Sequence, residues 1–442
     1  RKGHAHLAFS KTENLTSEGY FSYVKDFKGG HNLNATAGYS YFEVNGENFG
    51  MDNYNFSVDG IKYWDIGQGS YLTDGKAGMS SGKSVTERLF SFFARANYSY
   101  QDKYMLSASI RHEGSSKFAA DNRWANFWSA TAGWRISNEE FMKDFDWLDD
   151  LKIRFGYGVT GNNDFSATYM ANMLGSDTNW MMPNGTWAYS YGKSQNVNPN
   201  LGWEEKKEWN LGVDYSFFEG RLYGKFDYYR RKVDNLLFSV KVPQPPYTQG
   251  SQMQNIGSME SKGWEFEVGG DIIRTKDFTW SSSMNLSHNT GKILTLEGDN
   301  SYHNGNGFVA PGTPGDAARM EAGSTIGSFY MWKFAGFDDE GSFLLYNKDG
   351  EVIPAAQKTE NDKQYIGNYT PKLIIGWSHT LTYKNFDLGI NLRSWIDFDV
   401  YNTINMYYGI QGQGNLNVLK DAYGKFNHIK GEKQVCDYFL ED

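Results

Sequence analysis

The sequence has almost no cysteine and few prolines: Cys436 is the one cysteine in 442 residues, and there are nine prolines. A single cysteine excludes an internal disulfide framework and a cysteine-based zinc site. The 43 basic and 52 acidic residues give a net charge of −9, which argues against a nucleic-acid partner. No stretch approaches the roughly 18 consecutive apolar residues of a membrane-spanning helix.

Aromatic residues and glycine are abundant instead. Tryptophan, tyrosine and phenylalanine together make up 17% of the chain, and there are 49 glycines. Because disordered chains contain few aromatic residues, this composition argues against disorder. A polar average combined with many aromatic residues is typical of a large β-sandwich or propeller. It is equally typical of an outer-membrane β-barrel, whose strands are apolar only at every second residue.

Apolar and polar residues alternate strictly in many segments. In 208–217 the odd-numbered residues are Trp, Leu, Val, Tyr and Phe, and the even-numbered residues are Glu, Asn, Gly, Asp and Ser. Such alternation over eight or more residues predicts a strand with one apolar and one polar face. The same pattern recurs in 33–41, 90–100, 104–110, 128–136, 151–159, 222–228, 264–272, 278–286, 373–383 and 386–393.

The predicted connections between these strands alternate in length. Short polar turns are predicted at 28–30, 101–103, 218–220, 274–277 and 384–385, and long polar segments at 43–85, 162–202, 235–255, 294–370 and 400–435. Transmembrane barrels have this arrangement, with short periplasmic turns and long extracellular loops. Residues 137–150 are an exception, because they form a longer connection at the periplasmic end, where the other connections are short. We predict a capped helical turn there.

Aromatic residues also gather near the ends of the predicted strands, as Tyr98, Tyr100 and Tyr104 do. Girdles of aromatic rings mark both membrane interfaces of a barrel. A soluble sandwich also uses aromatic residues, but the polar positions here carry many charges, which a wet barrel interior accommodates and a second packed sheet does not. We therefore predict an all-β fold, an antiparallel up-and-down transmembrane β-barrel of which this chain holds about a dozen strands.

A series of short motifs follows from about residue 90 to the end of the chain. They are 91–98 with 102–104, Trp134-Arg135-Ile136-Ser137, 157–163, Asn198-Pro199-Asn200-Leu201-Gly202-Trp203-Glu204, Trp209-Asn210-Leu211-Gly212-Val213-Asp214, Gly220-Arg221-Leu222, Asp227-Tyr228-Tyr229, 255–258 with 262–265, and 365–368 with 371–372. No single motif is decisive. In this order and spacing, however, they closely resemble the SusC/RagA family of TonB-dependent outer-membrane transporters.

The resemblance implies a plugged barrel in the outer membrane of a Gram-negative bacterium that imports a glycan or an oligopeptide. It implies a SusD-like surface lipoprotein as a lid over the outer rim, and a TonB complex that supplies energy through the plug. It also implies that residues 1–442 are one barrel domain that lacks the N-terminal plug and the last strands, because such barrels have about 22 strands. The closing residues 437–442 would begin a further strand.

We expect no enzymatic activity, metal or cofactor. Residues 78–82 match G-x-S-x-G but lie in a predicted polar loop, whereas a nucleophile needs a strand before it and a helix after it. His4 and His6 share one strand face at best, and no third metal ligand is in reach by sequence. The acidic turns at 338–340 and 348–350 lack the register of a calcium loop.

Aromatic residues in the predicted outer loops are the candidate substrate-binding residues. Four of them, among Asn, Gly and Met, are Trp180, Trp187, Tyr189 and Tyr191. Flat rings flanked by amides suit sugar faces or peptide backbones. The alternative is that these rings pack on another loop or on a lid protein. Segment 400–411, with Tyr401, Tyr407 and Tyr408, is a second candidate.

Charged residues at the polar strand positions are expected to face the barrel interior and to set its electric field. They are Arg95, Lys152, Arg154 and Arg393. The alternative is ordinary pairing with acidic residues of neighbouring strands. Val213 and Ile390 are expected on the lipid face. Two other classes of function stay open, a passive porin-like pore and a surface carbohydrate-binding β-protein.

Overall fold

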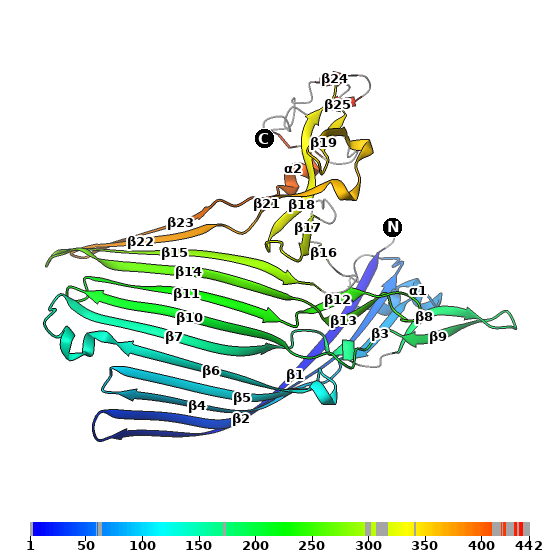
Figure 1. Cartoon of the computed structure of the whole chain (residues 1–442). Helices are drawn as coiled ribbons and strands as arrows, with labels where there is room; N and C mark the ends of the chain where they lie inside the picture. Colours follow the sequence, from blue (N-terminus) through cyan, green and yellow to red (C-terminus); the bar gives the residue numbers. More distant parts are fainter. Residues whose placement is uncertain are drawn as a thin grey trace. The chain divides into compact units, whose positions relative to one another are not determined.

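The computed structural model describes residues 3–58, 60, 64–170, 174–296, 302–305, 317–339, 342–408, 417, 419–420, 428–430 and 433–435. Cys436 and the predicted closing strand at 437–442 lie outside these residues. Most of the described chain is β-strand, and the main feature is one large sheet (Figure 1).

Strands follow one another in the large sheet in chain order. They are β1 (His4–Phe27), β2 (His31–Tyr54), β4 (Glu87–Tyr100), β5 (Tyr104–Ser115), β6 (Trp124–Arg135), β7 (Leu148–Asn162), β10 (Glu204–Phe217), β11 (Leu222–Asp234), β14 (Ser258–Arg274), β15 (Phe278–Thr295), β22 (Leu373–Tyr383) and β23 (Phe386–Ile396), with β3 (Gly78–Lys83) beside β2. Each pairing whose register is described is antiparallel. This is the predicted up-and-down order.

Smaller elements lie in the long connections. The strands are β8 (Leu174–Met181), β9 (Trp187–Lys193), β12 (Leu237–Lys241), β13 (Ser251–Asn255), β16 (Tyr302–Gly305), β17 (Ala318–Glu321), β18 (Ser328–Phe337), β19 (Phe343–Tyr346), β20 (Val352–Pro354), β21 (Lys363–Asn368), β24 (His428–Lys430) and β25 (Lys433–Val435). The helices are α1 (Ser70–Thr73) and α2 (Thr403–Tyr408), with 3₁₀ turns at Ile66–Gln68, Ala120–Asn122, Ile136–Asn138, Glu140–Met142, Ala167–Met170, Ala355–Gln357 and Glu360–Asp362. No helix within the described part of the chain is long and apolar enough to cross a membrane.

The chain divides into two compact units. The first comprises Arg1–Trp134, Gly156–Lys207 and Asp234–Ile256, and the second comprises Arg135–Phe155, Glu208–Val233 and Gly257–Asp442. The first unit contains β1–β6 and the hairpins β8–β9 and β12–β13. The second contains β14, β15, β22, β23 and the small sheet β16–β21.

The strand registers of the first unit separate an apolar face from a polar face. Residues directly opposite each other in neighbouring strands share a face, and one such row joins Leu33, Tyr98 and Leu106. On the other face, Ser109 and Ser129 lie opposite each other, with their hydroxyls 2.7 Å apart. Leu106 of the apolar row is 56% exposed, as expected of a surface that no second sheet covers.

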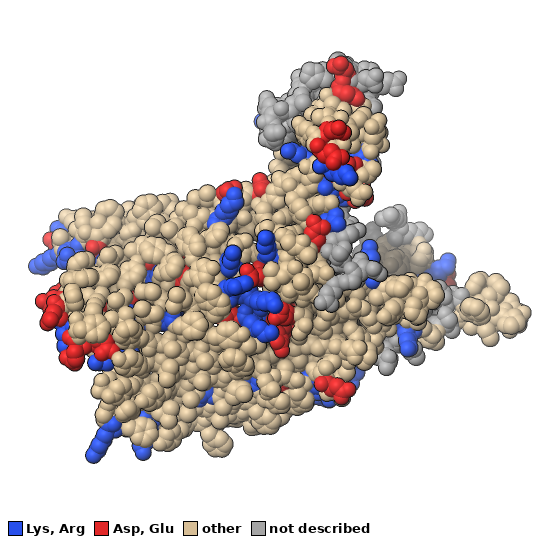
Figure 2. Space-filling view, in the orientation of Figure 1, with Lys and Arg blue, Asp and Glu red and all other residues tan. Residues whose placement is uncertain are grey.

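The second unit has the same two faces. Met284, Trp377 and Leu392 lie opposite one another across β15, β22 and β23, and Leu392 is 51% exposed. Over β10, β11, β14 and β15, charged side chains gather near the turns and again toward the loops, with few between them (Figure 2). The predicted alternation is therefore confirmed in both units.

Three segments differ from the prediction. β1 (His4–Phe27) was not among the predicted strands, because its apolar and polar residues do not alternate strictly. β2 runs on to Tyr54, where a polar connection was expected from residue 43, and residues 78–83 form β3 instead of a loop. The reason is the backbone: β2 pairs with β1 residue by residue from His31 to Tyr54, and β3 pairs with the outer end of β2. A ladder of backbone hydrogen bonds needs no apolar alternation, so the sequence pattern missed this extension.

The short turns lie where they were predicted. Gln101 and Asp102 adopt left-handed backbone conformations in the three-residue connection between β4 and β5, as the two central residues of a type I′ turn do. The predicted helical turn at 137–150 is present as two 3₁₀ turns, and the Asp150 carboxylate accepts a hydrogen bond from the Ser137 hydroxyl and pairs with Arg135.

The small sheet β16–β21 is an elaborate connection between β15 and β22. A capping box closes one of its turns: the Asp362 carboxylate accepts hydrogen bonds from the Thr359 hydroxyl at 2.7 Å and the Thr359 backbone N–H at 2.8 Å. These two bonds, the hydroxyl first, hold the pKa of Asp362 below its usual value of 3.8. The indole N–H of Trp332 donates to the Thr359 carbonyl oxygen, so the turn also anchors β18.

We expect this turn to loosen in acid. Because the pKa of Asp362 is lower in the folded chain, its contribution to stability is complete above pH 3.8 and is lost as the pH falls through the lower folded value. Asp362→Asn should therefore speed hydrogen exchange of residues 355–365 relative to the unchanged protein at pH 5, and the ratio of the two rates should approach one at pH 2. A ratio that stays constant over this range would contradict the assignment.

Candidate functional site at the loop end of the sheet

An exposed hairpin carries the four aromatic residues predicted to bind substrate. Trp187 and Tyr191 lie four residues apart in β9 and therefore share one face of the β8–β9 hairpin. Trp180 pairs with Ala188 and lies on the opposite face. Trp180, Trp187 and Tyr191 are 66%, 63% and 70% exposed. Tyr189 lies between Trp187 and Tyr191 in β9, but its side chain is outside the described part of the chain. The structure thus brings Trp187 and Tyr191 together and separates Trp180 from them.

The turn of this hairpin is built from local hydrogen bonds. The Asn184 side-chain oxygen accepts bonds from the backbone N–H and the hydroxyl of Thr186, and Gly185 takes a left-handed conformation. These bonds close the turn, and the β8–β9 hairpin projects away from the rest of the first unit (Figure 1).

A buried aromatic cluster lies beneath the loops of the first unit. Its members are Phe118, Phe127, Val159, Phe165, Leu201 and Trp203. Leu201 is fully buried, and the Trp203 ring centroid lies 5.0 Å from that of Phe118 and 5.2 Å from that of Phe127. The Trp203 indole N–H donates to the Arg123 carbonyl oxygen at 3.1 Å. The cluster joins the β5–β6 connection, β6, β7 and the long connection from β7 to β10, so it fixes the base of the loops.

The Asn198–Glu204 motif forms part of this base. The Asn198 side chain donates to the Met253 carbonyl oxygen and accepts the Asn200 backbone N–H. At the other end of the motif, the Glu204 carboxylate accepts bonds from the Leu237 backbone N–H and the Asn162 amide. The motif therefore connects β13, β12 and the end of β7 to the start of β10.

Two more asparagines make side-chain hydrogen bonds to the backbone of the same loops. Asn255 accepts the Gly202 backbone N–H and donates to the carbonyl oxygens of Gly202 and Asn235. Asn196, which is buried, donates to the carbonyl oxygens of Gln249 and Ser251. Side-chain amides satisfy backbone groups that no strand ladder reaches. In the sequence, Asn255 only contributed to the family resemblance and Asn196 belonged to none of the motifs. Only the hydrogen bonds show that both asparagines hold the loops.

Gly161 has a steric role in this base. A Cβ atom at this position would lie 2.0 Å from the Phe127 ring, so no larger residue fits without moving that ring. The glycine in the 157–163 motif therefore lets the aromatic cluster close against β7.

The second candidate segment is a packing element. The Tyr401 hydroxyl donates to the Met406 sulfur at 3.2 Å, and its ring lies 6.3 Å from that of Phe329. Burial raises the pKa of Tyr401. Tyr408 is half-buried in α2, and the side chain of Tyr407 is outside the described residues.

Two of the four predicted interior charges, Lys152 and Arg154, form ion pairs on the polar face of the second unit. Arg154 makes two hydrogen bonds to the Asp214 carboxylate, at 2.8 and 2.9 Å, and also contacts Asp227 at 3.1 Å, while Lys152 lies 3.3 Å from Asp214. A Cβ atom at Gly212 would lie 2.6 Å from both Arg154 and Asp227, which explains the glycine in that motif. Elsewhere, Arg95 donates to Asn97 at 3.3 Å, and Arg393 lies opposite Gly376.

The residues considered for catalysis or metal binding do not lie in the surroundings that a catalytic or metal site requires. Residues 78–82 lie in β3, so the strand–turn–helix context of a nucleophile is missing there. His4 and His6 each lie 2.9 Å from one Asp52 oxygen, a contact that sequence spacing did not reveal. Among the described residues, no group of three or more His, Cys, Asp or Glu residues is arranged to hold a metal ion.

Comparisons with known proteins agree with this architecture. Residues 4–424 match the family model described as TonB dependent receptor-like, beta-barrel. The TonB-dependent receptor SusC of Bacteroides thetaiotaomicron is 34% identical over 340 residues, which cover 74% of this chain and 33% of SusC. TonB-dependent receptor P3 of Formosa agariphila is 33% identical over 425 residues, which cover 90% of this chain and 40% of that receptor.

Solved structures show the same fold. The RagAB peptide importer in its closed-closed state superposes with a TM-score of 0.77 and 26% identity, over 98% of this chain and 46% of the importer chain. The chain therefore spans less than half the length of these relatives. The predicted fold class and outer-membrane location are confirmed. The chain belongs to the TonB-dependent receptor β-barrel family of the outer membrane and is similar, within it, to SusC and to the RagAB importer.

Proposed function

We propose that the whole protein actively imports a glycan or an oligopeptide across the outer membrane. The observation that carries this proposal is the exposed aromatic hairpin β8–β9 on a rigid, buried base at the loop end of the sheet. Support comes from SusC, a TonB-dependent receptor, and from RagAB, a peptide importer. Exposed aromatic rings held on a fixed scaffold suit capture of a flexible polymer, because the rings themselves lose little conformational freedom on binding.

The proposal includes two partners. A TonB complex supplies energy from the periplasmic side, and a SusD-like lipoprotein covers the loop end. The β5–β6, β7–β10 and β11–β14 connections of the first unit contribute to one buried base at this end, which gives a lid a defined surface to close on. Substrate binds without covalent chemistry, since the relatives are receptors rather than enzymes.

Uptake in the native bacterium tests this function. Deleting the gene should abolish growth on one of three sole nutrients (malto-oligosaccharide, fructan or a tripeptide), and loss of the TonB complex should have the same effect. A passive pore would keep uptake after TonB loss. A surface binding protein would be released by salt without detergent.

The two faces of the β8–β9 hairpin allow a more specific prediction. If Trp187 and Tyr191 contact substrate together, Trp187→Ala and Tyr191→Ala should each weaken binding of the imported nutrient about tenfold, equivalent to about 1.4 kcal/mol. Trp180→Ala is the matched control, because Trp180 is equally exposed but lies on the other face. Calorimetry with the purified protein measures all three. Equal losses for the three variants would contradict a one-sided site.

A further inference from the structure

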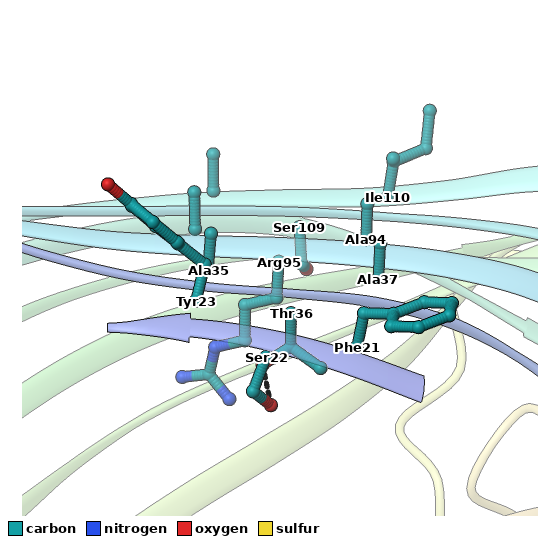
Figure 3. A pocket seen from close by; sticks show the side chains of 12 residues that line it. Phe21, Ser22, Tyr23, Ala35, Thr36, Ala37, Ala94, Arg95, Ser109 and Ile110 are labelled. Atoms are coloured by element: carbon teal, nitrogen blue, oxygen red, sulfur yellow. Dashed lines mark hydrogen bonds between the residues drawn. The ribbon is translucent and has the colours of Figure 1, made fainter. Parts of the chain in front are cut away.

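The apolar face of the first unit contains a groove floored by small residues. Ala35, Ala96 and Ala108 lie opposite one another across β2, β4 and β5. The next row, which begins with Ala37 and Ala94, ends at Ile110. Phe21 and Tyr23 of β1 form one side of the groove, which has a volume of about 510 Å³. Figure 3 shows Ile110 and the labelled alanines Ala35, Ala37 and Ala94 on one side of the sheet, with Tyr23, and it shows Ser22, Thr36 and Arg95 directed to the other side.

A pocket of charged residues lies on the same face, toward the loop end. Its volume is about 310 Å³, and its charged lining residues are three basic ones, Lys11, Lys83 and Arg88, and three acidic ones, Glu13, Glu43 and Glu47. The strand registers place Arg88 opposite Glu43 and Lys83 opposite Glu47, in the rows that continue the alanine rows outward. All three carboxylates have a cationic partner: Arg88 pairs with Glu43 at 2.7 Å, and Lys11 pairs with Glu13 at 2.7 Å and with Glu47 at 4.0 Å. Lys83 has no ion-pair partner among the described residues, so its ammonium group is available to an anion.

The distance between groove and pocket along the membrane normal matches half the thickness of the hydrocarbon core of a membrane. Glu43 lies six positions beyond Ala37 in β2, which is about 20 Å along the strand at about 3.3 Å per residue. With a strand tilt of about 40°, this is about 15 Å along the membrane normal, half of a hydrocarbon core of about 30 Å. Two aromatic rows lie between them, Tyr39 opposite Phe92 and Tyr41 opposite Phe90, as at a membrane interface.

We propose that groove and pocket form one binding site for an anionic, phosphate-bearing lipid of the outer leaflet. An acyl chain lies against the aromatic rows and ends in the groove, where alanines let it approach the backbone closely. The phosphate meets Lys83 and Arg88, because cationic side chains at the membrane surface attract anionic headgroups. Long loops mark the extracellular end of such barrels, which assigns the site to the outer leaflet. The site lies on the outer wall and is separate from the loops proposed to capture substrate.

Native mass spectrometry of the full-length protein in mild detergent tests this site. Dimyristoyl phosphatidic acid is the probe, dimyristoyl phosphatidylcholine is the zwitterionic comparison, and inorganic phosphate tests the headgroup alone. We expect one phosphatidic acid per chain, at least tenfold lower occupancy by phosphatidylcholine, and no displacement by millimolar phosphate. Equal occupancy by the two lipids, or displacement by phosphate, would overturn the proposal.

Two variants test the two ends of the site separately. Ala96→Phe fills the groove, and Lys83→Glu reverses the unpaired charge; each should lower phosphatidic acid occupancy about tenfold. Ala132→Phe is the matched control, because Ala132 lies opposite Leu106 on the same face but outside the groove. Circular dichroism confirms that each variant keeps its β-structure. Occupancy equal to that of the unchanged protein in both site variants would refute the proposal, as would the same loss in the control.

Discussion

Trp203→Ala is expected to lower the free energy of unfolding of the loop base by about 3–5 kcal/mol, the range for removing a buried aromatic side chain. The Trp203 side chain is almost fully buried between Phe118 and Phe127, and its indole N–H satisfies the Arg123 carbonyl oxygen. Alanine leaves a cavity and an unpaired carbonyl group. The first unit should then unfold at lower denaturant concentration, and trypsin should cut faster between residues 163 and 203.

Two controls separate packing from the hydrogen bond and from general effects of losing a tryptophan. Trp203→Phe keeps an aromatic ring but loses the bond to Arg123, so it should cost only about 1–2 kcal/mol. Trp180→Ala removes an exposed ring and should leave stability unchanged. If Trp203→Ala were as stable as Trp180→Ala, the cluster would not support the loops.

Val213→Arg and Ile390→Arg are expected to cost about 2–4 kcal/mol each, because a charge on the lipid face near mid-membrane leaves water without a partner. Val213 belongs to the apolar positions of β10, next to Asp214, which pairs with Arg154 on the polar face. Ile390 lies opposite His379 on the apolar face of β23 and is 41% exposed.

Folding into phospholipid vesicles at graded urea concentrations measures these losses. Asn391→Arg is the matched control, because Asn391 is the chain neighbour of Ile390 and lies on the polar face opposite Ser378. It should fold almost as well as the unchanged protein. Similar losses for Ile390→Arg and Asn391→Arg would mean that the two faces of β23 are assigned wrongly.

The candidate site was only partly predictable. Aromatic residues among amides in 178–191 indicated an exposed binding segment, and the structure does expose Trp180, Trp187 and Tyr191. Their arrangement was not predictable, because pairing in the β8–β9 hairpin decides which rings share a face. Substrate contact by these rings stays a prediction. The second segment looked similar in sequence, yet Tyr401 packs against Phe329 and Met406.

The sequence alone determined the faces of the strands, since side chains alternate along a strand whatever its neighbours are. Tertiary structure decided everything that depends on register between distant segments. It aligned the alanines of β2, β4 and β5 into a groove, extended β2 through backbone pairing with β1, and buried Leu201 and Trp203 under the loops. The physical reason is that burial and hydrogen-bond pairing are properties of two segments in contact, whereas alternation is a property of one.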